Sequence, residues 1–463
     1  MSKKLSKKDL LQTPKGTADI LPHDVLRWEA VESKAAEIAR FYGFQPMRTP
    51  HIEHAELFLP TLGETSDIVE KQMYSFRTRG GDQLVLRPEW TVPAVRAYFE
   101  HGMQAWPQPV MLYQAGSFFR HESPQRGRWR EFGQFDLEIL GEETAIADAL
   151  IIRVLSLIFE ELGLKNFLIH LNSLGDKECR PEYRRELASY YRRKFNSLCK
   201  DCKRRLKTNP LRLLDCKEPI CGELKAEAPK MIDFACEACR GHFKGLLEFL
   251  DDMKVPYFLD PYLVRGLDYY SRTVFEIFVK EPAETPNNPA ESGKDGGLNP
   301  EKKIQPIAIA SGGRYDYLAE SLGQKAVFGV GGAIGLDRLL DAFKISQTKI
   351  LKEKKPNLFL IQLGIQGKKK SLILFEILRR AKFNIGQSLA KDNLRAQLQS
   401  ADKAGASVVL IIGQKEAMDG TIIVRDMSAG TQETVLEAKI IDYLKKKLSP
   451  KANPHRAGEN KNV

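Results

Sequence analysis

Residues 118–141, FFRHESPQRGRWREFGQFDLEILG, join a basic turn to a strand in which polar and apolar side chains alternate. The turn is surrounded by four arginines, Arg120, Arg126, Arg128 and Arg130. One face of the strand would carry Phe132, Gln134, Asp136 and Glu138, and the other face Phe135, Leu137 and Ile139. Because burying charge is costly unless the charge is paired, the polar face is either a solvated hairpin face or a binding site.

The residues around this turn resemble a known motif. Phe119-Arg120-x-Glu122, the basic loop and Arg130-x-Phe132 are similar to motif 2 of the class II aminoacyl-tRNA synthetases, and more closely to that motif in the bacterial histidyl-tRNA synthetases. Three further stretches match the same family in its order: LRPEWT at 86–91, LVRGLDYYSRTVFE at 263–276 and GVGGAIGLDRLL at 329–340. Arg-Gly-Leu-Asp-Tyr-Tyr is the most specific of these, and the resemblance covers about residues 13–448.

Length and composition limit the kind of protein. The chain has 463 residues, more than the roughly 250–300 at which a single core stops growing, so it should form more than one domain. Its net charge of +11 suits a polyanionic partner such as RNA without requiring one. No apolar run approaches the ~18 residues of a membrane span, and the N-terminal MSKKLSKKDL lacks the apolar segment of a signal peptide. We therefore expect a cytoplasmic protein with no membrane partner.

The pattern of elements predicts an α+β catalytic domain over residues 13–343. A helix should begin near Pro22 with Asp24 as its N-cap and stop at Gly43, and an edge strand that contains Pro50 should follow. Further strands are expected at 84–87, 110–114, 167–171, 256–259 and 273–279, and helices at 91–101 and 144–162. In the resembled family these elements form an antiparallel sheet flanked by helices, and the first helix and strand lie at the interface of a homodimer.

Three segments depart from this pattern. Residues 174–255 are helical, are basic in their first half and hold all seven cysteines, and they resemble the helical insertion of the bacterial family. Residues 281–303 are rich in proline, glycine and asparagine and predict a flexible loop. Residues 1–12 are polar and are expected to be disordered.

The last part of the chain alternates strands and helices. After a linker at 344–356, strands are expected at 358–363 and 407–412, helices at 368–381 and 393–404, two short strands around residues 428–431, and a final helix. Such alternation predicts a small α/β domain over 357–448 with a mostly parallel sheet, followed by a tail at 449–463. This domain resembles the anticodon-binding domain of the family.

The resemblance implies a chemistry that the arginines suit. Amino-acid activation brings a carboxylate to the α-phosphate of ATP and expels pyrophosphate, so fixed positive charge must hold two anions in line. Arginine binds phosphate and carboxylate through a planar fork of donors and keeps its proton. In the family's pattern, Arg120 would bind the α-phosphate, and Arg265 would bind both the histidine carboxylate and the α-phosphate. These two are the expected catalytic residues.

The same pattern assigns the nucleotide site. Glu122 would accept a hydrogen bond from the adenine amino group, Phe132 would stack beneath the ring, and Arg338 would stack above it and reach the γ-phosphate. Four glycines of the last motif would let the backbone approach the nucleotide: Gly329, Gly331, Gly332 and Gly335. ATP would enter with Mg²⁺.

A selective site for histidine needs matched polar groups, because a neutral imidazole offers one donor and one acceptor. The family's histidine-contacting positions correspond to Glu89, Thr91, Gln134, Glu138, Tyr269, Tyr270 and Tyr315, together with Arg120 and Arg265. Of these, Glu89, Thr91 and Gln134 would bind the α-amino group, and Glu138, Tyr270 and Tyr315 would line the imidazole. The chain departs from the usual pattern at Trp90, Gly133 and Asp136.

The implied reaction ends with transfer of histidine to the 3′ end of tRNA(His). The basic loop, with Gln125, Arg126 and Arg128, would meet the acceptor end of the tRNA, and the C-terminal domain would meet the anticodon. Basic loops of this kind contact phosphates before they read bases. The residues alone indicate a charged loop.

The cysteines raise a separate question. Cys199-x₂-Cys202 and Cys236-x₂-Cys239 are two pairs with zinc-ligand spacing, with Cys216 and Cys221 between them. The pairs favour a structural Zn²⁺ on Cys199, Cys202, Cys236 and Cys239. However, the 33 residues between the pairs exceed the usual spacing, and cysteine is also a common small core residue. Both interpretations stay open at this stage.

Two other classes of function are compatible with parts of the pattern. Histidyl-synthetase-like subunits sense histidine or RNA without catalysis, and they would have lost catalytic arginines or the C-terminal domain. A general RNA-binding protein is supported by charge alone. Because Arg120, Arg265, Arg338 and the C-terminal domain are all present, the sequence favours an ATP-dependent histidine–tRNA ligase.

Overall fold

The computed structural model describes residues 9–63, 66, 68–123, 127–279, 308–345, 356–389 and 392–448. The chain forms two compact units that divide between residues 351 and 352, and each is described by itself. None of the described helices is long and apolar enough to cross a membrane. The expected loop at 281–303, the tail at 449–463, and most of the linker at 344–356 lie outside the described residues.

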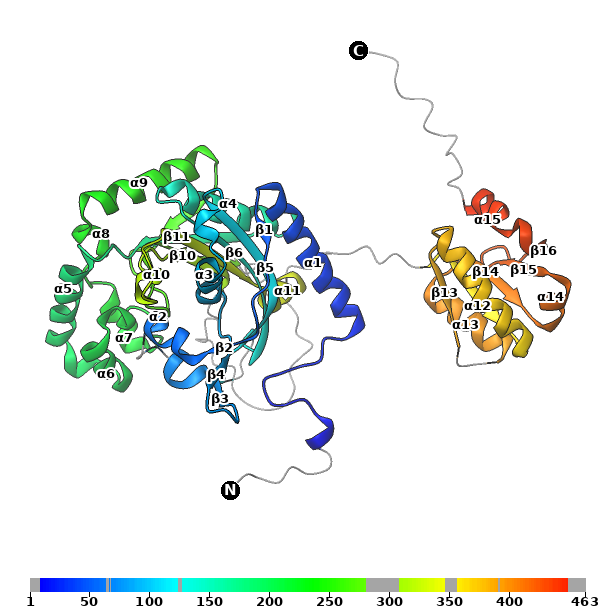
Figure 1. Ribbon diagram of the computed structural model, residues 1–463, viewed down its shortest axis with the longest axis horizontal. Helices are drawn as coiled ribbons and strands as arrows, with labels where there is room; N and C mark the ends of the chain where they lie inside the picture. The colour runs from blue at the N-terminus through cyan, green and yellow to red at the C-terminus, as the bar shows by residue number, and fades with distance from the viewer. Residues whose placement is uncertain are drawn as a thin grey trace, which may run out of the picture. The chain divides into compact units, whose positions relative to one another are not determined.

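An eight-stranded sheet forms the centre of the first unit (Figure 1). Its spatial order is β1-β5-β6-β11-β10-β9-β7-β8, and its strands are β1 (Gln45–Pro46), β5 (Val110–Phe119), β6 (Glu131–Leu140), β7 (Phe167–Ser173), β8 (Tyr257–Leu259), β9 (Ser271–Val279), β10 (Ala308–Arg314) and β11 (Gly329–Gly335). The six inner strands pair antiparallel, and the two outermost strands pair parallel to their neighbours. The expected antiparallel sheet is therefore confirmed.

The alternation in β6 gives the sheet two different faces. Phe135, Leu137 and Ile139 belong to a core cluster with apolar side chains of β7, β9 and β11. The helices that complete this cluster are α1 (Pro22–Phe41), α4 (Ala145–Glu161), α9 (Glu237–Asp252) and α11 (Leu336–Ile345). The opposite face carries Asp136 and Glu138, which are also buried. The polar face is thus an enclosed site and not a solvated hairpin.

Helix α1 begins earlier than the capping residue predicts. Leu21 occupies the N-cap position and Pro22 the first helical position, where proline needs no hydrogen-bonded amide. Asp24 lies in the first turn, so the prediction that it caps the helix is wrong. The edge strand after the helix is confirmed only in part: β1 lies at the margin of the sheet and pairs with β5, but it ends at Pro46, and Pro50, which the prediction placed in this strand, lies in the connection to β2.

A second core lies on the other side of the sheet and extends into the insertion. It includes α3 (Thr91–Glu100), the short helices α2 (Leu59–Leu62) and α10 (Leu318–Ser321), and a small sheet of β2 (Ile52–His54), β4 (Gln83–Leu86) and β3 (Tyr74–Arg77). The insertion itself consists of α5 (Arg180–Arg193), α6 (Lys200–Thr208), α7 (Pro219–Lys225), α8 (Met231–Phe234) and α9. Its predicted helical character is confirmed.

The second unit has a five-stranded sheet in the order β13-β12-β14-β15-β16. Its strands are β12 (Leu358–Gln362), β13 (Ile385–Gln387), β14 (Val408–Ile412), β15 (Thr421–Asp426) and β16 (Gln432–Leu436), and its helices are α12 (Gly364–Arg380), α13 (Leu394–Ala404), α14 (Gln414–Asp419) and α15 (Ile440–Leu448). Two core clusters cover the two faces of β12 and β14, which explains their continuous apolar runs.

Two predicted details of the fold are corrected. The sheet of the second unit is mixed and not mostly parallel, because β15 and β16 return antiparallel beside β14. The N-terminal prediction is also too broad, since Asp9–Leu11 form a short 3₁₀ turn. Residues 1–8 lie outside the described residues.

Gly312 generates a prediction about the stability of the first unit. A Cβ added there would lie 2.6 Å from the Cα of Gly332 on β11 and 2.7 Å from the ring of Phe275, so the strands would have to separate. Gly312→Ala should lower the free energy of unfolding by at least about 2 kcal/mol. Urea unfolding followed by tryptophan fluorescence measures this, because all four tryptophans lie in the first unit.

Gly241→Ala is the matched control for this prediction. Gly241 is an exposed position inside α9, and an added Cβ there meets nothing within 4 Å. Helix propensity predicts a gain of about 0.5–1 kcal/mol for this variant. Equal stability of the two variants would contradict the close approach of β10 to β11.

Candidate active site

The polar face of the central sheet brings together side chains from four neighbouring strands. In the strand register, Glu138 of β6 lies opposite Gly331 of β11, and Glu276 of β9 lies opposite Ser311 of β10. The same register places Gln134 opposite Gly335. Residues that are more than 100 positions apart in the chain therefore share one surface.

Glu138 links two other parts of the unit to this surface. Its carboxyl oxygens accept hydrogen bonds from the hydroxyl of Thr91, at 2.6 Å, and from the hydroxyl of Tyr315. The side chain is 2% exposed. Burial raises the pKa of Glu138 to about 8, against the two hydrogen bonds, and nearby Glu89 adds to the increase. A group that ionises near neutrality can donate to or accept from an imidazole.

Glu89 lies beside Glu138 and fixes the start of α3. Its two oxygens accept from the amides of Thr91 and Val92, both at 2.9 Å, and the hydroxyl of Tyr269 donates to it at 3.2 Å. Burial raises the pKa of this carboxyl, although these hydrogen bonds oppose the shift. The structure therefore gives Glu89 a helix-capping contact that the sequence did not indicate.

Three tyrosines and one glutamine border the two carboxyls. The ring centroid of Tyr269 lies 4.6 Å from that of Tyr270 and 5.9 Å from that of Tyr315, and all three rings are buried. Gln134 is half-buried, and its buried Oε1 accepts no hydrogen bond from the described residues. An acceptor without a partner at this surface can bind a donor such as an ammonium group.

The glycines of the last motif make room for the side chains of this surface. A Cβ on Gly331 would overlap the carboxyl of Glu138, and a Cβ on Gly329 would overlap the ring of Tyr315. A Cβ on Gly332 would press on Leu155 and Phe275 in the core. Of the four glycines, Gly335 has the most space. The absence of side chains at Gly329 and Gly331 thus explains how Glu138 and Tyr315 reach each other.

Arg265 lies at the other end of the surface and is held by two partners. It pairs with Glu276, and its Nη2 donates to the hydroxyl of Ser311 at 2.7 Å. Burial opposes its charge, but Glu276 raises the pKa of Arg265 above its usual value. Its buried Nε has no partner among the described residues. Arg265 also lines a pocket with Arg180, Arg184 and Arg212 of the insertion.

Arg120 links the end of β5 to the residues that precede α3. Its Nε donates to the carbonyl oxygen of Pro88 at 2.9 Å, and its guanidinium lies 5.2 Å from the centre of the Phe132 ring. Burial lowers the pKa of Arg120, with Glu122 and Glu89 opposing the shift. Glu122 in turn pairs with Arg128 at 3.3 Å. A buried cation over an aromatic ring leaves its remaining donors for a ligand.

Arg338 completes the positive side of the site. From the first turn of α11, it donates to the carbonyl oxygens of Gly127, at 2.9 Å, and Ala308, at 3.0 Å. Burial lowers its pKa, and repulsion from Arg128, Arg120 and Arg265 adds to the decrease. The three arginines of the sequence prediction therefore lie close enough to repel one another, which is the situation that a polyphosphate relieves.

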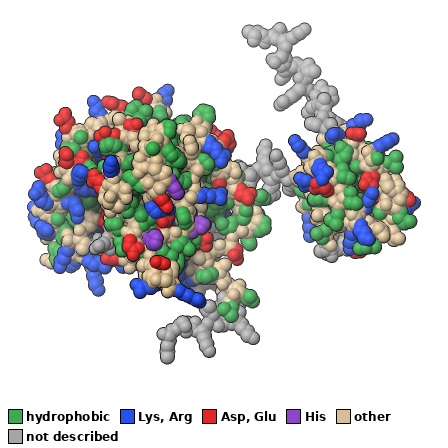
Figure 2. All heavy atoms as spheres, in the orientation of Figure 1, with side chains coloured by type: hydrophobic (Ala, Val, Ile, Leu, Met, Phe, Trp, Pro, Cys, Tyr) green, Lys and Arg blue, Asp and Glu red, His purple; other side chains and the backbone are tan. Residues whose placement is uncertain are grey.

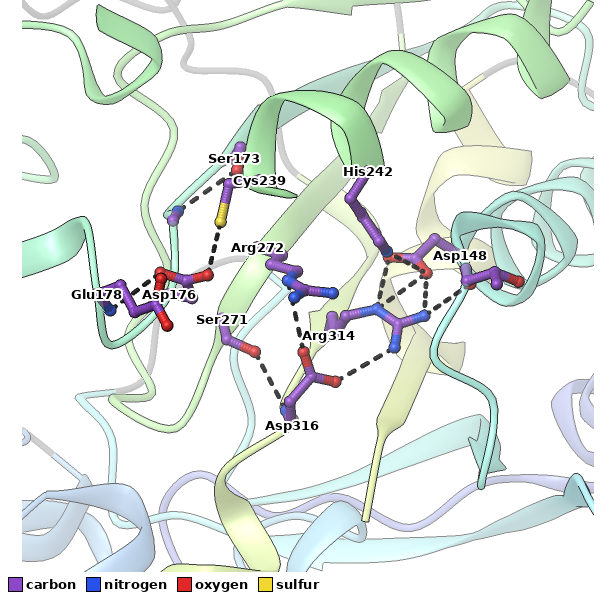
Figure 3. Close-up of polar contacts among 12 residues, drawn as sticks. Asp148, Ser173, Asp176, Glu178, Cys239, His242, Ser271, Arg272, Arg314 and Asp316 are labelled. Carbon is purple, nitrogen blue, oxygen red and sulfur yellow. Dashed lines mark hydrogen bonds and ion pairs between the residues drawn. The ribbon is translucent and has the colours of Figure 1, made fainter. Parts of the chain in front are cut away.

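Several residues that shape the site were missed by the sequence analysis. Glu276 and Ser311 hold Arg265, although Glu276 ends the same quoted motif as Arg265. Arg314 precedes Tyr315 and is fully buried, pairing with Asp148 of α4 and with Asp316 at 3.2 Å (Figure 3). Although burial opposes ionisation, Arg314 lowers the pKa of Asp148 to about 2. This buried pair anchors the backbone that presents Tyr315.

The structure shows what surrounds each of the three residues that depart from the family pattern. Trp90 is buried in the core around α3, at 1% exposure. A Cβ on Gly133 would collide with the ring of Trp28 on α1, so the small residue accompanies that tryptophan. Asp136 is buried, and its pKa is raised well above the usual value by burial and by Glu138, with Arg87 opposing.

The predicted zinc set is corrected by the structure. Cys199 and Cys202 lie together with Cys216 and Cys221, whereas Cys236 and Cys239 lie in a separate cluster. The four cysteines predicted to share one ion therefore belong to two places: the first pair is joined by two later cysteines of the insertion, and the second by Asp176 and Cys179 at its start. Both clusters are in the insertion. Gln125 and Arg126 of the basic loop lie outside the described residues.

The arrangement can bind a zwitterion beside a polyanion. Carboxyls and tyrosine hydroxyls at one end suit an amino group and an imidazole, and three arginines at the other end suit a carboxylate and phosphates. Within the described ranges, the side chains grouped closely enough to bind a metal lie in the insertion and not at this surface. A metal at the surface would therefore arrive with its ligand.

Family models match both units of the chain. The model described as "Histidyl-tRNA synthetase" matches residues 16–286, and the one described as "Anticodon binding domain" matches residues 359–447. The first match covers β1 and β5 to β9 of the central sheet and ends before β10 and β11, and the second covers nearly all of the second unit.

Curated relatives match nearly the whole chain. A "Histidine--tRNA ligase" of Pelotomaculum thermopropionicum is 41% identical over 95% of this chain and 99% of its own length. One of Natranaerobius thermophilus is 40% identical over 91% of this chain and 96% of its own. The solved structure of the apo histidyl-tRNA synthetase of S. aureus superposes with a TM-score of 0.74 at 31% identity, and the match covers 94% of this chain and all of that one.

Replacing Glu138 by glutamine should change how stability depends on pH. The pKa is about 8 in the folded protein and about 4.5 for an ordinary glutamate. Between these two pH values the folded state therefore keeps a proton that the unfolded state releases. The contribution of this carboxyl to the free energy of unfolding is complete below about pH 4.5 and is lost as the pH rises through about 8. Relative to the unsubstituted protein, Glu138→Gln should gain up to about 1.4 kcal/mol of unfolding free energy per pH unit between these values.

Urea unfolding between pH 5 and 8.5, followed by tryptophan fluorescence, measures this difference. Glu131→Gln, at an exposed position of the same strand, is the control and should run parallel to the unsubstituted protein. A constant difference between Glu138→Gln and the unsubstituted protein at every pH would show that the carboxyl is not held neutral in the folded state.

Proposed function

Because the chain belongs to the histidyl-tRNA synthetase family, we infer that it is an ATP-dependent histidine–tRNA ligase with a class II catalytic unit. It activates L-histidine with ATP to histidyl-adenylate and pyrophosphate, and transfers histidine to the 3′ end of tRNA(His). One observation carries the roles assigned below: buried carboxyls and half-buried arginines lie on the same side of the central sheet.

We assign histidine to the carboxyl end of this surface. The α-amino group would be bound by Glu89, Thr91 and the unpartnered oxygen of Gln134. The imidazole would lie against Glu138, Tyr270 and Tyr315, and Tyr269 would orient Glu89 through its hydroxyl. Since these polar groups are buried, an amino acid that cannot pair with them leaves them unsatisfied, which costs binding energy.

ATP would lie along the arginines. Phe132 would stack beneath the adenine, with Glu122 accepting from its amino group and Arg338 above it, close to the γ-phosphate. Arg120 would bind the α-phosphate. Arg265 would bind both this phosphate and the histidine carboxylate, which fixes the attacking oxygen in line with the leaving pyrophosphate. In this assignment Arg265 and Arg120 are the catalytic residues.

Mg²⁺ would enter with ATP and neutralise the β- and γ-phosphates as pyrophosphate leaves. The arginines hold the α-phosphate without help from a protein-bound metal in this proposal. Any Zn²⁺ would be structural, because the thiol clusters belong to the insertion.

The tRNA would contact three parts of the chain. The second unit would bind the anticodon, and the loop with Gln125, Arg126 and Arg128 would bind the acceptor end. Figure 2 shows Lys and Arg side chains gathered at the edge of the first unit where α5 and α6 lie. The exposed members of this surface are Arg184, Arg185, Arg192, Arg193, Lys200, Arg204 and Lys207. Such a surface attracts phosphates without reading sequence.

We propose a homodimer in the cytoplasm. Apolar side chains near the edge strand β1 support a partner at this edge: Phe41 is 85% exposed and Ile52 is 47% exposed. Exposed apolar groups next to a strand edge are typical of interfaces. The second subunit would cover them.

The non-catalytic relatives remain the alternative class. A subunit that only senses histidine would need the carboxyl end of the surface but not the arginines. Here Arg120, Arg265 and Arg338 are half-buried and held by specific partners, which a sensor has no reason to retain. The second unit is also present. Both observations favour the ligase.

The role of Arg265 can be tested by ATP–pyrophosphate exchange in the presence of histidine. Arg265→Ala should reduce the exchange rate at least about 100-fold, because it removes the positive charge that would stabilise the α-phosphate as the histidine carboxylate attacks it. Arg193→Ala, which removes an exposed arginine from α5, is the control and should exchange at the normal rate. A nearly normal rate for Arg265→Ala in a folded protein would exclude this residue from the chemistry.

A further inference from the structure

The seven cysteines of the chain lie between residues 179 and 239, and all seven are free thiols in the structure. They gather in two clusters, and within each cluster the possible ligand atoms all lie within 4.8 Å of one another. The first cluster consists of Cys199, Cys202, Cys216 and Cys221, and the second of Asp176, Cys179, Cys236 and Cys239. No cysteine is left outside these clusters, and the reaction described above uses none of them.

The first cluster has the dimensions of a tetrahedral sulfur site. The Sγ atoms of Cys199 and Cys216 are 3.8 Å apart. Four sulfurs at the usual Zn–S distance of about 2.3 Å would be separated by about 3.8 Å, which is the edge of the tetrahedron. Backbone amides also point at these sulfurs, because the amide of Cys202 donates to Cys199 and that of Cys199 to Cys221, both at 3.4 Å. Amide donors of this kind stabilise thiolates.

The sequence spacing of the first cluster also fits a zinc site better than the 33-residue gap between the two Cys-x₂-Cys pairs does. The ligands follow the pattern Cys-x₂-Cys-x₁₃-Cys-x₄-Cys, close to that of zinc ribbons. Cys199 is the N-cap of α6, Cys202 lies in its first turn, and Cys221 lies on α7. The cluster therefore ties two short helices together.

The second cluster has three sulfurs and one carboxylate. The Sγ atoms of Cys179 and Cys239 are 3.8 Å apart, and Oδ2 of Asp176 lies 3.0 Å from the sulfur of Cys239 and 3.6 Å from that of Cys236 (Figure 3 shows Asp176 facing Cys239). The other oxygen of Asp176 accepts from the amides of Glu178 and Cys179. These bonds orient Oδ2 into the cluster, as hydrogen bonds do for a metal-binding carboxylate.

This second cluster joins three separate segments beside the histidine site. Asp176 belongs to the loop after β7, Cys179 is the N-cap of α5, and Cys236 is the N-cap of α9. Arg180, which follows Cys179 in the chain, donates to the carbonyl oxygens of Gly175, at 2.9 Å, and Tyr270, at 2.7 Å. A metal at this cluster would fix the segment that presents Tyr270.

We propose that the insertion holds two structural Zn²⁺ ions, one on Cys199, Cys202, Cys216 and Cys221 and the other on Asp176, Cys179, Cys236 and Cys239. Thiolates with one carboxylate are ligands that suit Zn²⁺, and four protein ligands leave no open position for catalysis. Apart from the cysteines, the short helices α6 and α7 bury only Leu206, so the ion of the first cluster would contribute to folding of this part of the insertion. This inference does not depend on the proposed ligase reaction.

Metal analysis of the full-length protein, purified with a thiol reductant and without chelators, tests the proposal. Plasma mass spectrometry should find about two Zn per chain. Cys216→Ser and Cys239→Ser should each retain about one. Asp201→Asn and Glu237→Gln are matched controls, because each replaces an exposed acid between the two cysteines of a pair, and both should retain two.

A second measurement uses the unsubstituted protein and does not require the serine variants to fold. Titration with an organomercurial, followed by a zinc-binding dye, should release about two Zn as the seven thiols are blocked. Co²⁺ incorporated in place of Zn²⁺ should show the visible absorption of tetrahedral thiolate sites. Absence of metal after purification, with no Zn²⁺ or Co²⁺ uptake by the reduced protein, would overturn both sites. One Zn that survives in Cys239→Ser and is lost in Cys216→Ser would overturn the second site alone.

Discussion

The buried carboxyl of Glu138 is the contact on which the geometry of the site depends. It links β6 to the start of α3 through Thr91 and to the end of β10 through Tyr315, and it lies over Gly331 of β11. A carboxyl in this position must be neutral or must face a bound cation, because desolvation penalises an isolated charge. The glycines of β11, the burial of Tyr315 and the buried pair of Arg314 with Asp148 all serve to hold this group in place.

Desolvation acts on the three arginines of the site as well. Arg120, Arg265 and Arg338 are half-buried, and each is held by carbonyl, hydroxyl or carboxyl groups that leave other donors available. Their mutual repulsion is tolerated in the folded protein and would be relieved by a polyphosphate. In the proposed assignment, an acidic end and a basic end on one sheet would provide the binding energy for an amino acid and a nucleotide that must react with each other.

Much of this could be predicted from the sequence. Alternation in β6 predicted which of its residues line the site, and the four motifs supplied the residues that the register then brings together. Contacts that depend on tertiary structure could not be predicted: Glu276 and Ser311 beside Arg265, the capping role of Glu89, and Trp28 against Gly133. The grouping of the cysteines failed for the same reason, because Cys-x₂-Cys pairs give no information on which other ligands complete each cluster.

ATP–pyrophosphate exchange without tRNA, run with each of the twenty amino acids, tests most directly whether this site reads histidine. The account predicts exchange with histidine alone, with kcat/KM lower by a factor of about 10⁴ or more for amino acids that leave Glu138 and Tyr315 unpaired. Exchange with another amino acid at a comparable rate would contradict the assignment of these residues. Histidine binding without any exchange would contradict the ligase account itself and would identify the chain as a histidine sensor.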